Sequence, residues 1–207
     1  MRKVLSKKFF NRDTRVVAEE LLGKYLVRRI ATPRRGSGRA REIAGMITEV
    51  EVYDGPHDKG SHASRGMTPR NKIMFGHPGL WYPYFTYGMH WLVNITAREK
   101  GYPAAILIRG VQKVSGPAPL EISPAQRAPR GPRGGGLFLT GPARVTKFFK
   151  INGKLYGKPA VRSSGLWIED RRTKIKKSQI HKSARIGIEY AGEYWKKRRL
   201  RYILENF

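Results

Sequence analysis

The segment Ile47–Gly55, ITEVEVYDG, alternates side chains of two kinds and stops at a glycine that precedes a proline. A period of two is typical of a β-strand, and here it places Glu49, Glu51 and Tyr53 on one face and the residues between them on the other. The two carboxylates would stand roughly 6 to 7 Å apart along the strand. The segment therefore predicts a strand that carries two neighbouring acids.

Two more acids, Asp54 and Asp58, follow this strand closely. Carboxylates so placed can bind Mg²⁺, act as general acid and base, or simply be solvated. Val50 and Val52 alternate with the glutamates, so the strand can be buried, and a buried strand holds carboxylates for a purpose or beside positive partners. We therefore favour a functional or paired role over a solvated one, and the choice between metal binding and acid–base chemistry stays open.

After this strand the chain passes through residues 54–80, which are rich in Gly, Pro, His and Ser. A loop of this length inside a compact domain is usually functional or disordered. Trp81–Thr86 and Trp91–Thr96 are two β-prone runs around a short YGMH turn, which predicts a hairpin with Tyr87 near its tip. Six of the chain's 22 aromatic residues lie between 81 and 91, and core packing and a stacking pocket are equally good interpretations of any one of them.

Periodicity and turn residues divide the rest of the chain into short elements. One helix is expected at Asn11–Leu22, with Asn11 or Asp13 as its N-cap. A second helix is expected from the TGP sequence to about Lys150, with Thr140 as its cap. Further strands are expected at Lys24–Ile30, Glu42–Tyr53, Ala104–Val111, Gly165–Glu169 and Ile186–Tyr190.

Two stretches lack periodicity and are interpreted as basic loops. Residues 31–40, ATPRRGSGRA, would form a turn between two strands. Residues 115–136 contain five Pro, five Gly and three Arg, which predicts a flexible basic loop within a domain and not a linker between domains. With 207 residues and 23.6 kDa, the chain is expected to fold as a single domain, residues 1–207.

Charge is the most informative property of the composition. The chain has 42 Lys and Arg against 15 Asp and Glu, and a formal net charge of +27 repels itself unless the partner is a polyanion. Residues 51–100 carry only +2, whereas residues 151–207 carry +10. A nearly neutral, aromatic-rich quarter inside a basic surface suits an enzyme that holds a nucleic acid backbone electrostatically and inspects a base by stacking.

Several classes of site and location are excluded or not expected. The absence of cysteine excludes disulfides, thiolate zinc sites, iron–sulfur clusters and a cysteine nucleophile. The five histidines show no HExxH or paired ligand spacing, so we expect neither a metal nor another cofactor. No run approaches 18 apolar residues and the basic N-terminus lacks the apolar run of a signal peptide, so we expect no membrane partner and a cytoplasmic or nuclear location.

Residues 47–97 carry a resemblance to a known family. The pieces EVEVYDG, SHASRG, TPRN, MFGHPG and YGMHWLVN occur in the order found in the alkyladenine (3-methyladenine) DNA glycosylases of base-excision repair, nearly without gaps. The segments VAEELLGKYLVRR, AAILIRG, LTGPARVTKFF and ARIGIEYAGEYWKKRRLRY are similar to further parts of that family, so the resemblance covers most of the chain. It implies an α+β fold: a single compact domain with a curved antiparallel sheet, a protruding β-hairpin and surrounding helices.

For the chemistry, the resemblance implies that Glu51 is the general base that activates a water molecule. It implies that Arg109 helps to hold this water and the nearby backbone, and that the main chain around Ile186 contacts the water. Glu51 must be ionised to accept a proton, so Arg109 would help and Glu49 would hinder. Because water is the nucleophile and no Schiff-base lysine is implied, the enzyme would be monofunctional and would leave an abasic site without cutting the strand.

For recognition, the resemblance implies that Tyr53, His62 and Tyr84 are the walls of a pocket for a flipped base. Asn94 would discriminate against normal guanine, and Tyr87 would intercalate into the base stack. An alkylated purine is electron-poor or cationic, which favours stacking on electron-rich rings and weakens the glycosidic bond. The expected partner is double-stranded DNA with damaged purines, bound by a monomer, and the motifs do not separate 3-methyladenine, 7-methylguanine, hypoxanthine and ethenoadenine as substrates.

Two other classes of function fit part of the sequence. A basic RNA- or ribosome-associated binding protein would use the aromatic residues as core and the carboxylates as structural residues. A metal-dependent nuclease would use Glu49, Glu51 and Asp54 to bind its metal. Release of a free base from a damaged duplex in the presence of EDTA would distinguish the glycosylase from both.

Overall fold

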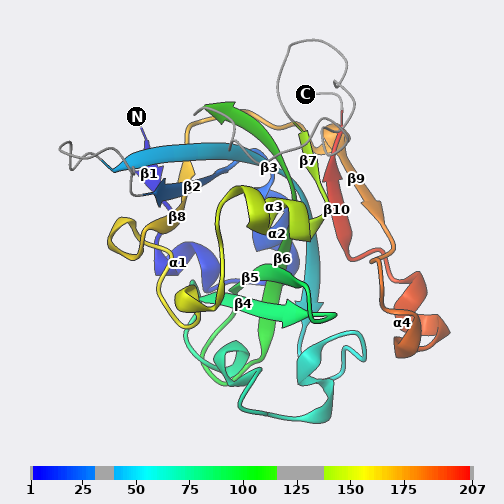
Figure 1. Cartoon of the computed structure of the whole chain (residues 1–207). Coiled ribbons are helices and arrows are strands. Elements are labelled where there is room, and N and C mark those ends of the chain that lie inside the picture. The colour runs from blue at the N-terminus through cyan, green and yellow to red at the C-terminus, as the bar shows by residue number, and fades with distance from the viewer. Residues whose placement is uncertain (1, 31–39, 116–137, 206–207) are drawn as a thin grey trace.

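The computed structural model describes residues 2–30, 40–115 and 138–205, and one long strand organises them (Figure 1). This strand, β3 (Arg41–Asp54), pairs on one side with β2 (Tyr25–Ile30) and then, around Glu51, with β10 (Arg201–Leu204). On its other side it pairs with β6 (Ala104–Ser115). The alternating segment predicted from the sequence is therefore part of the central strand of the sheet, in which residues 43–52 are all buried.

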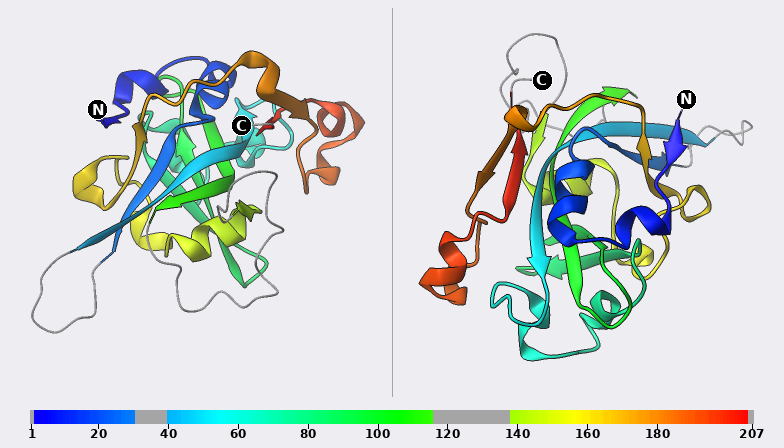
Figure 2. Two further views of the ribbon diagram at one scale, coloured as in Figure 1. Left: turned by 90° about the horizontal axis from the view of Figure 1, so that it is seen from above. Right: turned by 180° about the vertical axis from the view of Figure 1, so that it is seen from behind.

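The described strands form one antiparallel sheet of ten strands, which is visibly curved in Figures 1 and 2. Its main order is β1–β8–β2–β3–β6–β5–β4, with β10 and β9 attached along β3 and with β7 attached to β6. The expected curved antiparallel sheet is thus confirmed. The bounds of the remaining strands are β1 (Lys3–Val4), β4 (Trp81–Thr86), β5 (His90–Thr96), β7 (Phe138–Thr140), β8 (Leu166–Asp170) and β9 (Ile180–Ser183).

Four helices in the described ranges complete the mixed α+β fold. α1 (Lys7–Phe10) and α2 (Thr14–Leu21) cover one face of the sheet, and α3 (Pro142–Phe148) lies on the opposite face, while α4 (Glu193–Lys197) lies at the edge beside β9 and β10 (Figures 1 and 2). The side chain of Asp13 accepts hydrogen bonds from the N–H groups of the first turn of α2, which confirms one of the two predicted caps. None of these helices is long and apolar enough to cross a membrane.

The hydrophobic core lies between the sheet and the helices α1, α2 and α3. Large side chains that are almost completely buried, among them Trp81, Trp167, Phe10 and Phe148, fill it together with the valines and isoleucines of β3 and β6. The indole N–H of Trp81 donates to the carbonyl of Leu166, so its polar edge is also satisfied. Burial of this apolar surface rigidly fixes β3, and with it the acids that β3 carries.

The predicted hairpin is confirmed as β4 and β5, which pair antiparallel with Tyr84 opposite Leu92. Its aromatic residues differ in burial: Trp81 and Tyr82 are buried, whereas Phe85 and Tyr87 are exposed. The expected basic turn at 31–40 and the basic loop at 115–136 lie almost entirely outside the described residues.

Two local predictions are wrong. Residues 186–190 do not form a strand, because Gly187 takes a left-handed backbone with φ +75° and a 3₁₀ turn starts at Glu189; the strand of this region is β9, which ends at Ser183. Thr140 does not cap α3, because it belongs to β7 and the cap position is taken by Gly141.

Candidate active site

A pocket of about 430 Å³ opens where the β4–β5 hairpin, β6 and the segment 186–190 meet. Its size is that of a site for a small molecule or a single base. Residues proposed from the sequence that line it are Tyr53, His62, Tyr84, Tyr87, Asn94, Arg109 and Ile186. Glu51 lies beneath the pocket and has no exposed surface.

The β3–β6 ladder is irregular where it carries the charged residues of the site. Ile47 is opposite Val111 and Val50 is opposite Ile108, but the register shifts on both sides of Glu49. Such irregularities redirect side chains, and they are frequent beside active sites. Arg109 lies at this irregularity and approaches both acids: its Nε donates to Glu49 Oε1 at 3.0 Å, and its Nη1 lies 3.3 Å from Glu51 Oε1.

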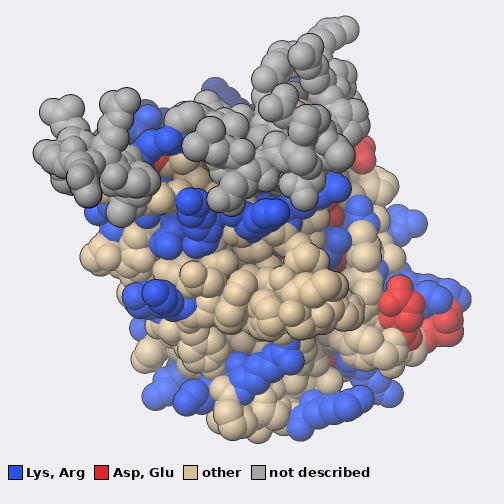
Figure 3. Space-filling model, in the orientation of Figure 1, with Lys and Arg blue, Asp and Glu red and all other residues tan. Residues whose placement is uncertain are grey.

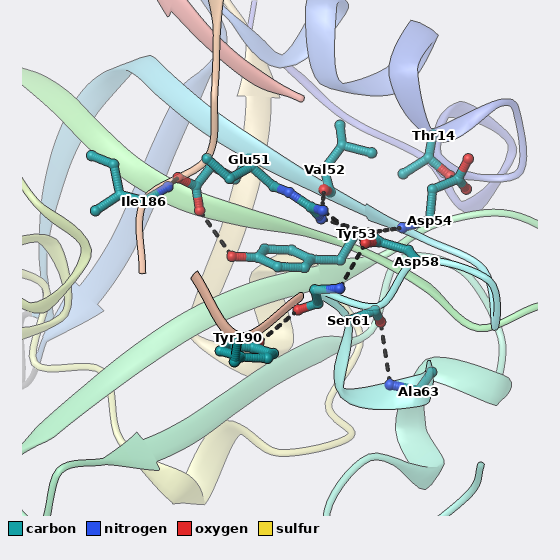
Figure 4. Close-up of polar contacts among 12 residues, drawn as sticks. Thr14, Glu51, Val52, Tyr53, Asp54, Asp58, Ser61, Ala63, Ile186 and Tyr190 are labelled. Atoms are coloured by element: carbon teal, nitrogen blue, oxygen red, sulfur yellow. Dashed lines mark hydrogen bonds and ion pairs between the residues drawn. The ribbon is translucent and has the colours of Figure 1, made fainter. Parts of the chain in front are cut away.

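Both oxygens of Glu51 have donors (Figure 4). Oε1 accepts from the backbone N–H of Ile186 at 2.9 Å, and Oε2 accepts from the hydroxyl of Tyr53 at 2.9 Å. Burial raises the pKa of Glu51, while the Arg109 guanidinium, the two hydrogen bonds and the Arg185 guanidinium act against this shift. Glu51 is therefore a desolvated carboxylate whose donors favour its charged form.

The second acid of the strand is also buried and paired. Glu49 is 6% exposed, and Arg201 Nε of β10 lies 2.9 Å from its Oε1. The solvated interpretation of the two acids is therefore wrong. Asp54 points away from them and accepts from the hydroxyl of Thr14 at 2.7 Å, so the three carboxylates of the nuclease alternative do not converge on one point.

Aromatic residues form much of the pocket wall. The rings of His62 and Tyr84 meet edge to face with centroids 4.8 Å apart, and His62 Nδ1 lies 2.9 Å from the Tyr82 hydroxyl. Partial desolvation, and secondarily the charge of Arg70, lower the pKa of His62 to about 4, so this ring is neutral at neutral pH. Burial raises the pKa of Tyr84 to about 12. The walls thus offer neutral π surfaces.

Two further predicted residues lie at different depths of the pocket. Tyr87 is at the hairpin turn, has φ +52° and is 81% exposed, as expected for a residue at the tip. Asn94 is buried in β5, where its amide donates to the carbonyl of Tyr82 at 3.2 Å. One therefore projects from the mouth of the pocket, and the other forms part of its inner wall.

Sequence reasoning missed a buried ion pair next to the pocket. Asp58, considered above as a metal ligand or a solvated acid, receives two hydrogen bonds from the guanidinium of Arg185 at 2.6 and 2.7 Å. Nothing in the sequence distinguishes Arg185 from the other basic residues of the chain. Tyr190, which also lines the pocket, was not proposed as a site residue from the sequence.

Comparison with known proteins gives a consistent result. The sequence model of the family described as "Methylpurine-DNA glycosylase (MPG)" matches residues 8–207. A protein of Methanocella arvoryzae named "Putative 3-methyladenine DNA glycosylase" is 40% identical over 190 residues, which are 92% of this chain and 87% of the relative. Proteins with the same name from Chlorobium phaeobacteroides and Legionella pneumophila are each 35% identical, covering 98% and 100% of this chain and 94% and 96% of theirs. The chain belongs to the methylpurine-DNA glycosylase family.

Proposed function

We propose that this protein is a monofunctional DNA glycosylase that flips alkylated or deaminated purines out of duplex DNA and hydrolyses the N-glycosidic bond, leaving an abasic site. The observation that carries this proposal is the desolvated carboxylate of Glu51 beneath an aromatic pocket, held by Arg109, the Ile186 N–H and the Tyr53 hydroxyl. Family membership supports the same class of reaction.

In the proposed reaction, Glu51 accepts a proton from the attacking water while the water oxygen bonds to the sugar carbon. The carbon–nitrogen bond breaks, and its electron pair leaves with the base. Burial raises the pKa of Glu51 and so its proton affinity, while the Arg109 guanidinium acts against this shift and favours the ionised carboxylate, so the group is suited to act as a general base. The main chain at Ile186 would complete the water site.

Selection of the base would combine stacking with shape. Tyr53, His62 and Tyr84 offer rings on which an electron-poor or cationic purine stacks well. Asn94 would obstruct the 2-amino group of guanine, whereas hypoxanthine has no amino group and adenine carries its own at C6. Extrusion costs a few kcal/mol, least for damaged or badly paired bases, and a ring that fills the vacated stack offsets part of this cost.

The ring that fills the stack would be Tyr87, which is exposed at the hairpin turn beside the pocket mouth. The partner is then double-stranded DNA with a damaged purine. One copy of the protein would bind it, in the cellular compartment that contains the chromosome. The aromatic pocket beside an exposed ring supports this order of events, in which the hairpin enters the duplex and the base enters the pocket.

The test is an incubation of the protein with duplexes that carry one deoxyinosine, ethenoadenine or 7-methylguanine, with EDTA present. We expect release of the free base and an alkali-labile abasic site, with no strand cut before alkali treatment. Nicking that requires added metal would support the nuclease instead. Binding of DNA or RNA without base release from any of these duplexes would support the binding protein.

A further inference from the structure

Arg185 is the most deeply buried cation near the pocket. Its side chain has no exposed surface, and neither has that of Asp58, its partner. Nη1 donates to Asp58 Oδ2 at 2.6 Å and to the carbonyl of Val52 at 2.8 Å, and Nη2 donates to Asp58 Oδ1 at 2.7 Å. A buried ion pair is weak evidence for stability, because desolvation offsets much of the attraction, so its position is the more informative property.

The carboxylate of Asp58 also accepts hydrogen bonds from the backbone of the loop that follows β3. Its two oxygens accept from the backbone N–H groups of Asp54 at 3.2 Å and Gly60 at 3.0 Å (Figure 4). The carbonyl of Gly60 in turn accepts from the Tyr190 hydroxyl at 3.0 Å, and Ser61 caps the turn that begins with His62. The ion pair therefore fixes the loop that leads to one pocket wall.

Arg185 also contacts the other wall and the support of the proposed base. Its guanidinium carbon lies 4.8 Å from the ring centroid of Tyr53, and it does not itself line the pocket. The carbonyl that it binds belongs to Val52, the residue between Glu51 and Tyr53. Ile186, the residue that follows Arg185 in the chain, donates its N–H to Glu51. The guanidinium thus contacts the Tyr53 ring and the backbone between two site residues, and the residue that carries it directly precedes the peptide that holds Glu51.

We propose that Arg185, through its ion pair with Asp58, is a positioning residue of this site: it fixes the Tyr53 ring and the Ile186 peptide so that the stacking wall and Glu51 keep the geometry required for excision. This inference rests on the proposed glycosylase function. A planar guanidinium can bind a carboxylate with two parallel hydrogen bonds while it stacks on a ring, and a lysine ammonium cannot do both. Arg185→Lys therefore keeps the charge and removes the geometry.

The chain contains a matched control in β8 and the residue after it. Arg171 Nε donates to the buried carboxylate of Glu169 at 2.9 Å, and its guanidinium carbon lies 4.3 Å from the ring centroid of Tyr25. None of these three residues lines the pocket. Arg171→Lys thus disturbs the same kind of arrangement, an arginine between a buried acid and a tyrosine ring, at a place that does not contact the site.

The experiment compares single-turnover excision of hypoxanthine, duplex affinity and thermal unfolding in the intact protein and both variants. Misplacement of site groups by about 1 Å can cost on the order of a hundredfold in rate, so we expect Arg185→Lys to lower the excision rate constant roughly ten- to a hundredfold. Affinity for undamaged duplex should stay within about twofold, because Arg185 is buried. Arg171→Lys should change the excision rate less than about twofold, even if it lowers the unfolding temperature as much.

A second variant, Gly60→Ala, tests the same geometry with every charge retained. A Cβ at Gly60 would lie 2.8 Å from Arg185 Nη2 and 3.3 Å from Asp58 Oδ1, so it must displace the pair. We expect the same selective loss of excision, which also keeps the inference testable if Arg185→Lys does not fold.

Excision within about twofold of the unmodified protein in either folded variant would overturn the positioning role, and so would an equal loss in Arg171→Lys. If the unmodified protein releases no base, the proposed function is wrong and this inference falls with it.

Discussion

The Glu51 side chain is fully buried, and the groups that donate hydrogen bonds to it can also bind a neutral glutamine side chain. In Glu51→Gln, the amide oxygen can accept from the Ile186 N–H, and the Tyr53 hydroxyl can reverse to accept from the new amide group. General base catalysis contributes about a hundred- to ten-thousandfold, so single-turnover excision should fall by at least that order. Lesion affinity should survive, because the shape is kept and a negative charge near DNA is removed.

The same substitution has a predicted effect on stability. A raised pKa means that the folded state binds this proton more tightly than the unfolded state, so the stabilising contribution exists at low pH and is lost as pH rises through the raised pKa. At neutral pH the ionised form is the costly one. We therefore expect Glu51→Gln to unfold, at neutral pH, at a temperature equal to or above that of the unmodified protein.

Glu49→Gln is the control for the effect of Glu51→Gln on activity. Equal loss of excision in both variants would mean that Glu51 is not the general base.

The pH dependence of excision is expected to report on Glu51. The base must be ionised, and its pKa is raised above the usual value of about 4.3, so the rate should fall with decreasing pH at a higher pH than for an ordinary glutamate. The pKa of His62 is lowered to about 4, which places its protonation below that transition. Single-turnover profiles with hypoxanthine should therefore show the same acid limb in His62→Gln, and disappearance of that limb would assign it to the histidine.

Among the elements, the β4–β5 hairpin carries two well-exposed aromatic rings, of which Tyr87 lines the pocket and Phe85 does not. Tyr87→Ala should weaken lesion binding and slow excision from a duplex, because nothing then fills the vacated stack. A lesion that is already unpaired should be affected less. Phe85→Ala is the matched control, since Phe85 is 45% exposed on the same hairpin and packs on Trp91 instead. Equal losses for paired and unpaired lesions would indicate a packing role for Tyr87.

The elements differ in how well the sequence predicts them. The long strand β3 and the hairpin were predictable because alternation over many residues, and a turn between two aromatic runs, are strong local signals. The segment 186–190 was not, because its apolar residues alternate like a strand while Gly187 takes a left-handed backbone and Ile186 donates its N–H to Glu51. The four-residue helix α1 is too short for a helical period to be seen.

The site shows the same division. The residues taken from the family resemblance all line one pocket, except Glu51, which lies beneath that pocket. Their roles stay predictions until variants are measured. The ion pair of Asp58 and Arg185 joins residues 127 positions apart and involves one arginine among 42 basic residues. No local pattern indicates such a pair, because it forms only after β3 and the segment after β9 have been brought together by the sheet.

At the scale of the whole molecule, the acids near the pocket are buried while many basic residues lie on the surface. The acids near the pocket, Glu49, Glu51 and Asp58, are buried and paired with arginine, so they contribute little to the field outside. Figure 3 shows Lys and Arg distributed around an uncharged central area of one face, with the visible acids mainly beside α4. With a formal net charge of +27, the exposed field is strongly positive.

This separation predicts how binding responds to salt. Basic residues around the pocket would neutralise several DNA phosphates, and each neutralised phosphate releases counterions when the complex forms. Affinity for undamaged duplex should therefore fall steeply as the salt concentration rises. We expect a slope of several units in a plot of log affinity against log salt concentration, measured by fluorescence anisotropy. Tyr87→Ala should keep this slope, because it removes a ring and no charge. A slope near zero would mean that the basic surface does not contact the DNA backbone, and the electrostatic part of the recognition would have to be replaced by contacts within the pocket alone.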